Sequence, residues 1–85
     1  MPHPITIRFF AHLKDLAGVP SVSLPVEQDC SLKQLIAQLE ETMPSLKSFA
    51  TDETIRIALN YAVVNREVII HPGDEVAFLP PFSGG

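Results

Sequence analysis

An amphipathic segment between Ser31 and Met43 is the feature that most constrains the fold of this chain. Its apolar residues recur at intervals of three and four, which places them on one stripe of an α-helix. Ser31 is a typical N-cap, Gln34 completes a capping box, and Pro44 ends the helix. A helix with one apolar stripe must bury that stripe against another element. The stripe comprises Leu32, Leu35, Ile36, Leu39 and Met43.

Two segments at opposite ends of the chain, residues 5–10 and 75–79, predict half-buried strands. Apolar and polar or exposed positions alternate in both, which is the period of a strand with one buried face. We expect one set of alternating side chains to face the helix and the other set to face away from it. The set that faces the helix is Ile5, Ile7, Phe9, Val76 and Phe78, and the set that faces away is Thr6, Arg8, Phe10, Ala77 and Leu79.

Shorter segments complete the predicted domain. Val22 and Leu24 alternate with serines before Pro25, which indicates an edge strand that pairs back on the first strand. Together the segments predict an α+β domain in which a mixed sheet covers a single main helix. The remaining predictions are a short helical turn at 11–17, a loop or helical turn at 45–54 that buries Leu46 and Phe49, a strand at 55–59, and strand-like runs at 63–64 and 68–70 around a turn at Asn65 and Arg66.

The last six residues, Pro80 to Gly85, suggest a chemical function. The two prolines favour an extended path, and the terminal diglycine is thin enough to enter a narrow tunnel in another protein. Fully extended, these residues span roughly 20 Å. We therefore expect the carboxylate of Gly85 to be a reactive group that partner enzymes activate. The alternative is that the tail is a frayed end or a cloning remnant without function.

Length and charge restrict the classes of function. With 85 residues the chain is expected to form a single domain, 1–85, and 46% hydrophobic residues indicate an ordered globule. The formal net charge of −4 disfavours binding to nucleic acid or to anionic membranes. From this charge we expect a partner with a basic docking surface.

The cysteine and the histidines bear on compartment and metal binding. There is no signal-like segment or long apolar run, and the single cysteine rules out an internal disulfide, so we expect a cytoplasmic protein. Cys30 precedes the main helix, whose dipole would lower its pKa, although a small, partly buried thiol is the favoured interpretation. His3, His12 and His71 do not have the spacing of metal ligands, so no metal site is expected.

The order of the elements, Phe9-Phe10-Ala11 after the first strand, and the segment from Gly73 to Gly85 resemble the MoaD family. Members of that family are the small subunits of molybdopterin synthase and act as sulfur carriers. The resemblance covers nearly the whole chain. It implies the ubiquitin-like β-grasp fold, with the first and last strands as parallel neighbours in the middle of the sheet.

The resemblance also implies a reaction at the tail. A MoeB-like adenylyltransferase joins the Gly85 carboxylate to AMP with ATP, and a sulfur donor converts the acyl-adenylate to a thiocarboxylate. A MoaE-like large subunit, with which the small subunit forms a heterotetramer, accepts the tail and passes the sulfur to cyclic pyranopterin monophosphate. Gly84 is the spacer that lets the tail pass. No permanently bound cofactor is implied, and no residue of this chain need act as acid or base, so the chain is a cosubstrate and not an autonomous enzyme.

The same resemblance assigns partner contacts. Phe10, Val63 and Leu79 match an apolar docking surface, and Lys14 matches a position that is often basic. The tail residues Pro80, Pro81, Phe82 and Ser83 contact the partner on the way to its active site. The outward positions of Phe10 and Leu79 agree with this role, while the alternative is that a loop or the segment from Leu46 to Phe49 covers them.

Other functions of a chain with this ending remain open. A sulfur carrier of the thiamine pathway and a ubiquitin-like protein modifier also end in diglycine. A thiamine carrier is disfavoured because such chains are usually shorter and lack the two prolines. A pure interaction module with an incidental tail belongs to a different class. Lysine conjugates distinguish a modifier from a carrier, which is released with its carboxylate regenerated.

Overall fold

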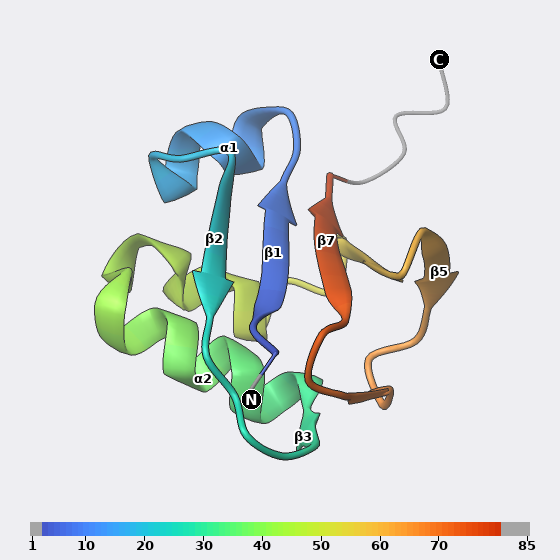
Figure 1. Ribbon diagram of the computed structural model, residues 1–85. Helices are drawn as coiled ribbons and strands as arrows, with labels where there is room; N and C mark the ends of the chain where they lie inside the picture. Colours follow the sequence, from blue (N-terminus) through green and yellow to red (C-terminus); the bar gives the residue numbers. More distant parts are fainter. Residues whose placement is uncertain (1–2, 81–85) are drawn as a thin grey trace.

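The computed structural model describes residues 3–80, which form a mixed sheet with one main helix behind it (Figure 1). The elements are β1 (Ile5–Phe9), α1 (His12–Ala17), β2 (Ser21–Leu24), β3 (Cys30–Ser31), α2 (Leu32–Thr42), the 3-10 helix η1 (Pro44–Ala50), β4 (Arg56–Leu59), β5 (Ala62–Val64), β6 (Ile69–Ile70) and β7 (Glu75–Leu79). Five strands form a sheet in the order β2-β1-β7-β4-β5. β1 and β7 are parallel, and the other pairs in this sheet are antiparallel. The predicted α+β, β-grasp architecture is confirmed.

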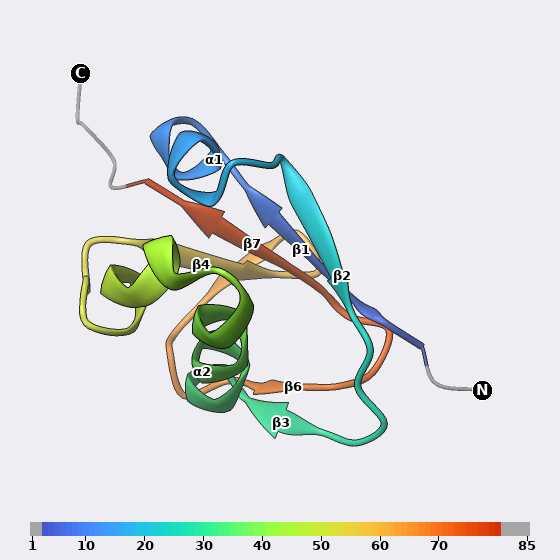
Figure 2. The ribbon, with the colours of Figure 1, turned by 90° about the vertical axis from the view of Figure 1, so that its left-hand side faces the viewer.

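The capping box predicted at the start of α2 is present. The Ser31 hydroxyl accepts a hydrogen bond from the Gln34 backbone N–H at 3.1 Å, and the Gln34 side-chain oxygen accepts one from the Ser31 N–H at 2.9 Å. These bonds satisfy backbone donors that a helix start leaves without partners. Figure 2 shows α2 on one side of the five-stranded sheet. The buried residues of the helix are those of its predicted apolar stripe: Leu32, Leu35, Ile36 and Leu39.

The strands alternate as predicted between a core face and an outer face. Phe9 and Phe78 are partners in the register of β1 and β7, and their rings stack with centroids 5.8 Å apart. Phe49, from η1, meets Phe78 edge-to-face with centroids 5.2 Å apart. Because η1 also buries Leu46, the prediction of a helical turn that packs two side chains into the core is confirmed. The inward residues of the two strands, Ile5, Ile7, Phe9, Val76 and Phe78, are at most 2% exposed.

A second, two-stranded sheet was not predicted from the sequence. The predicted runs at 63–64 and 68–70 belong to different sheets, because Ile69 and Ile70 of β6 pair antiparallel with Ser31 and Cys30 of β3. The sequence did not predict β3, because two residues are too few for a periodic pattern to appear. Ile70 of β6 is fully buried and belongs to the hydrophobic core, so β6 is tied to the body of the domain by residues far from it in the sequence.

Arg66 holds the connection between β5 and β6 against the body of the protein. Its guanidinium donates to three backbone carbonyls, those of Phe49 at 3.1 Å, Asp52 at 2.6 Å and Ile55 at 3.2 Å. A guanidinium has five donors in a planar fork, which suits several carbonyls at once. Arg66 was predicted only as part of a turn. In the structure its hydrogen bonds attach that turn to η1 and to the segment that leads into β4.

The helices of this domain are short. α2 has 11 residues, whereas a helix needs about 20 to cross a bilayer. Within residues 3–80, therefore, no helix has the length and apolar character of a membrane span.

Candidate functional site

The face of the five-stranded sheet that points away from α2, called here the outer face, carries exposed apolar side chains. Phe10 directly follows β1 and is 43% exposed, and Val63 on β5 is 62% exposed. Leu79, the last residue of β7, is half-buried. The structure therefore brings to one face the three residues for which the sequence resemblance implies docking.

The alternative that another segment covers this face is wrong for the segment from Leu46 to Phe49. Both of these side chains are at most 1% exposed and belong to the core. Phe49 packs against Phe78, whose side chain points in the opposite direction from its neighbour Leu79. The segment is consequently on the far side of the sheet from the docking residues.

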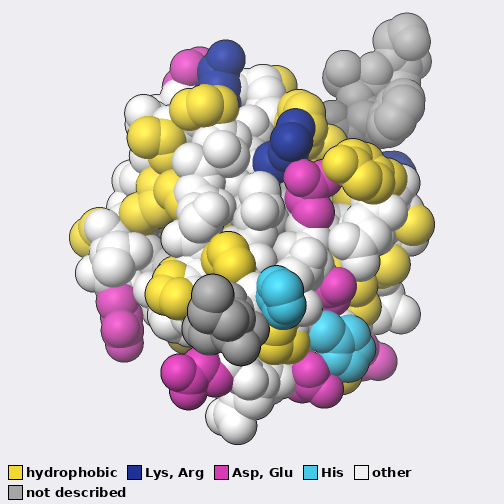
Figure 3. Space-filling view, viewed as in Figure 1, with side chains coloured by type: hydrophobic (Ala, Val, Ile, Leu, Met, Phe, Trp, Pro, Cys, Tyr) yellow, Lys and Arg dark blue, Asp and Glu magenta, His cyan; other side chains and the backbone are white. Residues whose placement is uncertain are grey.

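Small side chains make the centre of the outer face shallow. Arg8, Ala77, Ala58 and Val63 are successive partners in a row that crosses β1, β7, β4 and β5. Side chains of partnered residues project to the same face of a sheet. Two alanines thus lie between two larger residues, and Ala58 is only 7% exposed. Figure 3 shows this face in space-filling form. A partner is able to approach the backbone of the central strands closely here.

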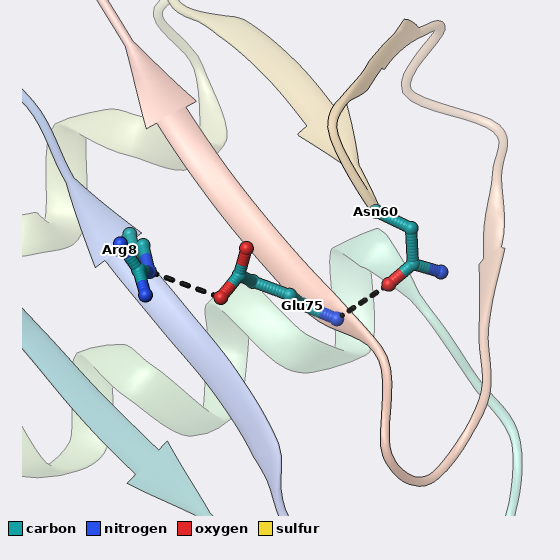
Figure 4. Close-up of polar contacts among 3 residues, drawn as sticks. All are labelled: Arg8, Asn60 and Glu75. Atoms are coloured by element: carbon teal, nitrogen blue, oxygen red, sulfur yellow. Dashed lines mark hydrogen bonds and ion pairs between the residues drawn. The ribbon is translucent and has the colours of Figure 1, made fainter.

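Glu75 is held from both sides at the start of β7. Its carboxylate accepts a hydrogen bond from the Arg8 guanidinium at 3.0 Å, and its backbone N–H donates to the side-chain oxygen of Asn60 at 3.0 Å (Figure 4). The side chain of Asn60 also donates to Asp74 at 3.1 Å. An exposed ion pair such as Arg8–Glu75 adds at most about 1 kcal/mol of stability. Its main effect is to fix which way the charged groups of the face point.

Basic side chains are exposed on the outer face and at its edge. Lys14, on α1, is exposed and lines a shallow hollow together with Arg8 and Phe10. Arg56 is the partner of Leu79 in the β4–β7 pair and is also exposed. Of these three basic residues, Arg8 pairs with the carboxylate of Glu75. The expectation of a basic partner rested on net charge alone and stays a prediction.

The tail begins beside these docking residues. The Phe10 N–H donates to the Phe78 carbonyl at 3.2 Å, which continues the β1–β7 pairing to the ends of both strands. Pro80 follows Leu79 and is half-buried. The other predicted tail residues, Pro81, Phe82, Ser83, Gly84 and Gly85, lie outside the described residues.

The residues considered for metal or redox chemistry do not gather into a site. His71 forms an ion pair with Asp29, Nδ1 to Oδ1 at 2.6 Å, and the hydrogen bond and negative charge of Asp29 raise the pKa of His71. Among residues 3–80, no three His, Cys, Asp or Glu side chains are grouped so as to hold a metal ion. Cys30 is partly buried, as favoured, but burial and the charge of Asp29 raise the pKa of its thiol. The prediction that the helix dipole lowers this pKa is therefore wrong, although Cys30 lies in β3 directly before Ser31, the N-cap of α2.

Asn60 and Tyr61 belong to the outer face but were not predicted from the sequence. They form the two-residue turn of the β4–β5 hairpin, since Leu59 and Ala62 are partners. Tyr61 is 85% exposed, and a hydrogen bond to Glu75 together with its negative charge raises the pKa of the Tyr61 hydroxyl. The asparagine between two apolar runs was the available indication of this turn. The tyrosine beside it obscured that indication, because tyrosine favours strands.

Comparisons with known proteins agree with this architecture. The model of the ThiS family matches residues 7–85. The molybdopterin synthase sulfur carrier subunit of Dictyostelium discoideum is 33% identical over 89 residues, with 100% of both chains covered. The solution structure of small archaeal modifier protein 1 from Methanosarcina acetivorans has 26% identity and a TM-score of 0.75, and covers 100% of this chain and 99% of that one.

A fourth observation concerns assembly. A structure described as the protein–protein complex of subunits 1 and 2 of molybdopterin-converting factor from Helicobacter pylori contains a chain with 28% identity and a TM-score of 0.66. The match covers 96% of this chain and 99% of that one. The family match over residues 7–85, the full-length curated relative and the shared fold lead to one conclusion: the chain belongs to the ThiS family, as a ubiquitin-like protein of the MoaD type.

Proposed function

We propose that this chain is the sulfur carrier subunit of a molybdopterin synthase. The observation that carries the proposal is the position of Phe10, which is exposed, and Leu79, which is half-buried, at the ends of the paired strands β1 and β7, directly before the tail. A protein that binds this face also reaches the start of the tail at Pro80. The full-length relative named as a molybdopterin synthase sulfur carrier subunit supports the same function.

The proposed chemistry takes place at the Gly85 carboxylate. A carboxylate is a poor electrophile, so an adenylyltransferase of the MoeB type first joins it to the α-phosphorus of ATP and releases pyrophosphate. Hydrosulfide supplied by a sulfur donor then attacks the acyl carbon of this acyl-adenylate, and AMP leaves with the bonding electron pair. The product is a thiocarboxylate on Gly85. Its sulfur forms a bond to a carbon of cyclic pyranopterin monophosphate, and water then hydrolyses the acyl–sulfur bond, which leaves the sulfur on the pterin and restores the carboxylate.

The chain itself supplies position and not proton transfer. Phe10, Val63 and Leu79 form the apolar part of the docking surface, and Lys14 is a cation at its edge. Pro80 begins the tail that a MoaE-like large subunit accepts, and Gly84 is the spacer before the reacting group. General acid and base groups belong to the partners, and ATP is used only by the activating partner. A cytoplasmic location, where these partners and ATP are found, is part of the proposal.

A ubiquitin-like modifier is the second candidate. The observation that favours it is the likeness to small archaeal modifier protein 1, which has the same fold at 26% identity over the full chain. A modifier uses the same acyl-adenylate but transfers the Gly85 acyl group to a lysine amine. The chemistry diverges only after activation, so the products distinguish the two functions.

The experiment is an intact-mass measurement of the full chain after incubation with ATP, a MoeB-type enzyme and a sulfur donor. We expect a mass increase that corresponds to replacement of one oxygen by sulfur, located at Gly85 by fragmentation. A chain that lacks Gly85 is the control and should show no such change. Lysine-linked conjugates without the sulfur product would assign the modifier function instead. Absence of both products with an activator that is active on another carrier would reject the proposal.

A further inference from the structure

The β4–β5 hairpin turn places a tyrosine where glycine is usual. Asn60 has φ +50° and Tyr61 has φ +73°, so both turn residues are in the left-handed region, the pattern of a type I′ turn. Asparagine tolerates this region, but the second position of such a turn is most often glycine. A tyrosine there is strained, because its β-carbon crowds the backbone.

The strain at Tyr61 is not offset by packing in the core. Its side chain is 85% exposed, the highest value among the large apolar or aromatic residues exposed in residues 3–80. Strained backbone conformations are found most often at functional positions, above all where burial of the side chain does not offset their cost. A ring held in solvent in this way points to a contact with another molecule.

The turn that carries Tyr61 is rigidly attached to β7. The Asn60 N–H donates to the Glu75 carbonyl at 2.8 Å, and the Glu75 N–H donates to the Asn60 side chain at 3.0 Å. The Asn60 side chain donates in turn to Asp74 at 3.1 Å. The backbone position of Tyr61 is therefore set before any partner binds. Rigid aromatic residues give contact area at a low cost in conformational entropy.

Tyr61 also adjoins the docking surface proposed above. Glu75, which acts on the Tyr61 hydroxyl, is the residue that Arg8 contacts on the outer face. Val63, two residues further along the same hairpin, is 62% exposed on that face. Figure 3 shows an acidic side chain between basic and hydrophobic ones on this side of the molecule. Val63 and Tyr61 therefore share one hairpin on the side of the sheet that carries Phe10 and Leu79.

We infer that Tyr61 is a docking anchor whose ring enters an apolar slot on the large subunit that accepts the tail, while its hydroxyl stays beside Glu75. The inference rests on the proposed function. Tyrosine is among the residues that dominate binding energy at protein interfaces. The occupant is the large subunit because the anchor and the start of the tail belong to one continuous face, and a chain 28% identical to this one occurs in a complex with a second subunit.

The test compares three variants of the full chain for affinity to the molybdopterin synthase large subunit of the same organism, by isothermal titration calorimetry, with Tm measured in parallel. Tyr61→Gly removes the ring and relieves the strain, so we expect Kd to rise at least about 10-fold while Tm does not fall. Tyr61→Phe keeps the ring and should bind within about 3-fold of the unaltered chain. Ile69→Ala is the matched control, because Ile69 is 49% exposed but lies on β6 in the other sheet. Its affinity should not change.

Each outcome decides the question. Loss of affinity in Tyr61→Gly, with Tm kept and Ile69→Ala unaffected, supports the anchor. Affinity of Tyr61→Gly within about 2-fold of the unaltered chain overturns it, and if Phe10→Ala is weakened at the same time, the proposed docking face stands without the anchor. An unaltered chain that neither binds the large subunit nor accepts sulfur overturns the proposed function and the anchor together.

Discussion

Replacing Phe78 by alanine tests the division of β7 into a core side and a docking side. Phe78 is fully buried, and its ring contacts two others, those of Phe9 and Phe49, at centroid distances of 5.8 Å and 5.2 Å. Truncation of a buried phenylalanine removes its transfer free energy and leaves a cavity, which together cost about 3–5 kcal/mol. For a chain of this length the whole free energy of unfolding is roughly 4–13 kcal/mol. The variant should therefore lose a large part of its stability.

Leu79→Ala is the matched control, one residue further along the same strand. Leu79 is half-buried on the outer face and is not among the buried core residues. Complete burial of a leucine is worth about 1.5–3 kcal/mol, so half of it is about 1 kcal/mol, and no closed cavity forms. The two variants should differ by about 2–4 kcal/mol in the free energy of unfolding.

The assay is urea unfolding followed by circular dichroism, with thermal melting as a second measurement. The Phe78→Ala variant should show a strongly lowered urea midpoint and a Tm lower by at least about 12 °C, since 1 kcal/mol corresponds to about 4–8 °C in a domain of this size. Leu79→Ala should stay within about 8 °C of the unaltered chain and should instead weaken binding to the large subunit. Equal losses of stability in the two variants would refute the assignment of faces.

Three further predictions concern stability and the tail. Asp29, aided by the charge of Asp74, raises the pKa of His71 in the folded state, so the Asp29–His71 pair stabilises the protein below the ordinary pKa of about 6.5. This contribution is lost as pH rises through the folded pKa. The urea midpoint of Asp29→Asn should therefore fall below that of the unaltered chain near pH 5.5 and match it near pH 9. Arg66→Met leaves three backbone carbonyls without their donor and should lower the free energy of unfolding by roughly 2–4 kcal/mol, which an unchanged urea midpoint would contradict. Deletion of Gly85 should keep the Tm and abolish thiocarboxylate formation in the intact-mass assay, whereas a lowered Tm would mean that the tail is structural.

The parts of the fold that the sequence predicted are those governed by neighbouring residues. The capping box joins Ser31 and Gln34, which are three residues apart, and the alternation in β1 and β7 appears within five residues. The outward positions of Phe10 and Leu79 followed from the same alternation. Their meeting on one face with Val63 was expected from the family resemblance and is present in the structure.

The missed features depend on residues far apart in the chain or on competing local signals. β3 was not predicted because Cys30 and Ser31 become a strand only when β6 lies beside them. The turn at Asn60 and Tyr61 was not predicted because tyrosine favours strands, and the bonds from Asn60 to Asp74 and Glu75 that hold this turn cross 14 and 15 residues of sequence.

By itself, the sequence determined the main helix with its cap, the alternating strands and the diglycine ending, because propensity, periodicity and capping act between neighbours along the chain. Only the tertiary structure decided which strands pair, where Tyr61 lies, and that the basic residues Arg8 and Arg56 share the outer face of a chain whose net charge is −4. Net charge is a sum over the whole chain, whereas a partner meets only the side chains that folding brings to one face.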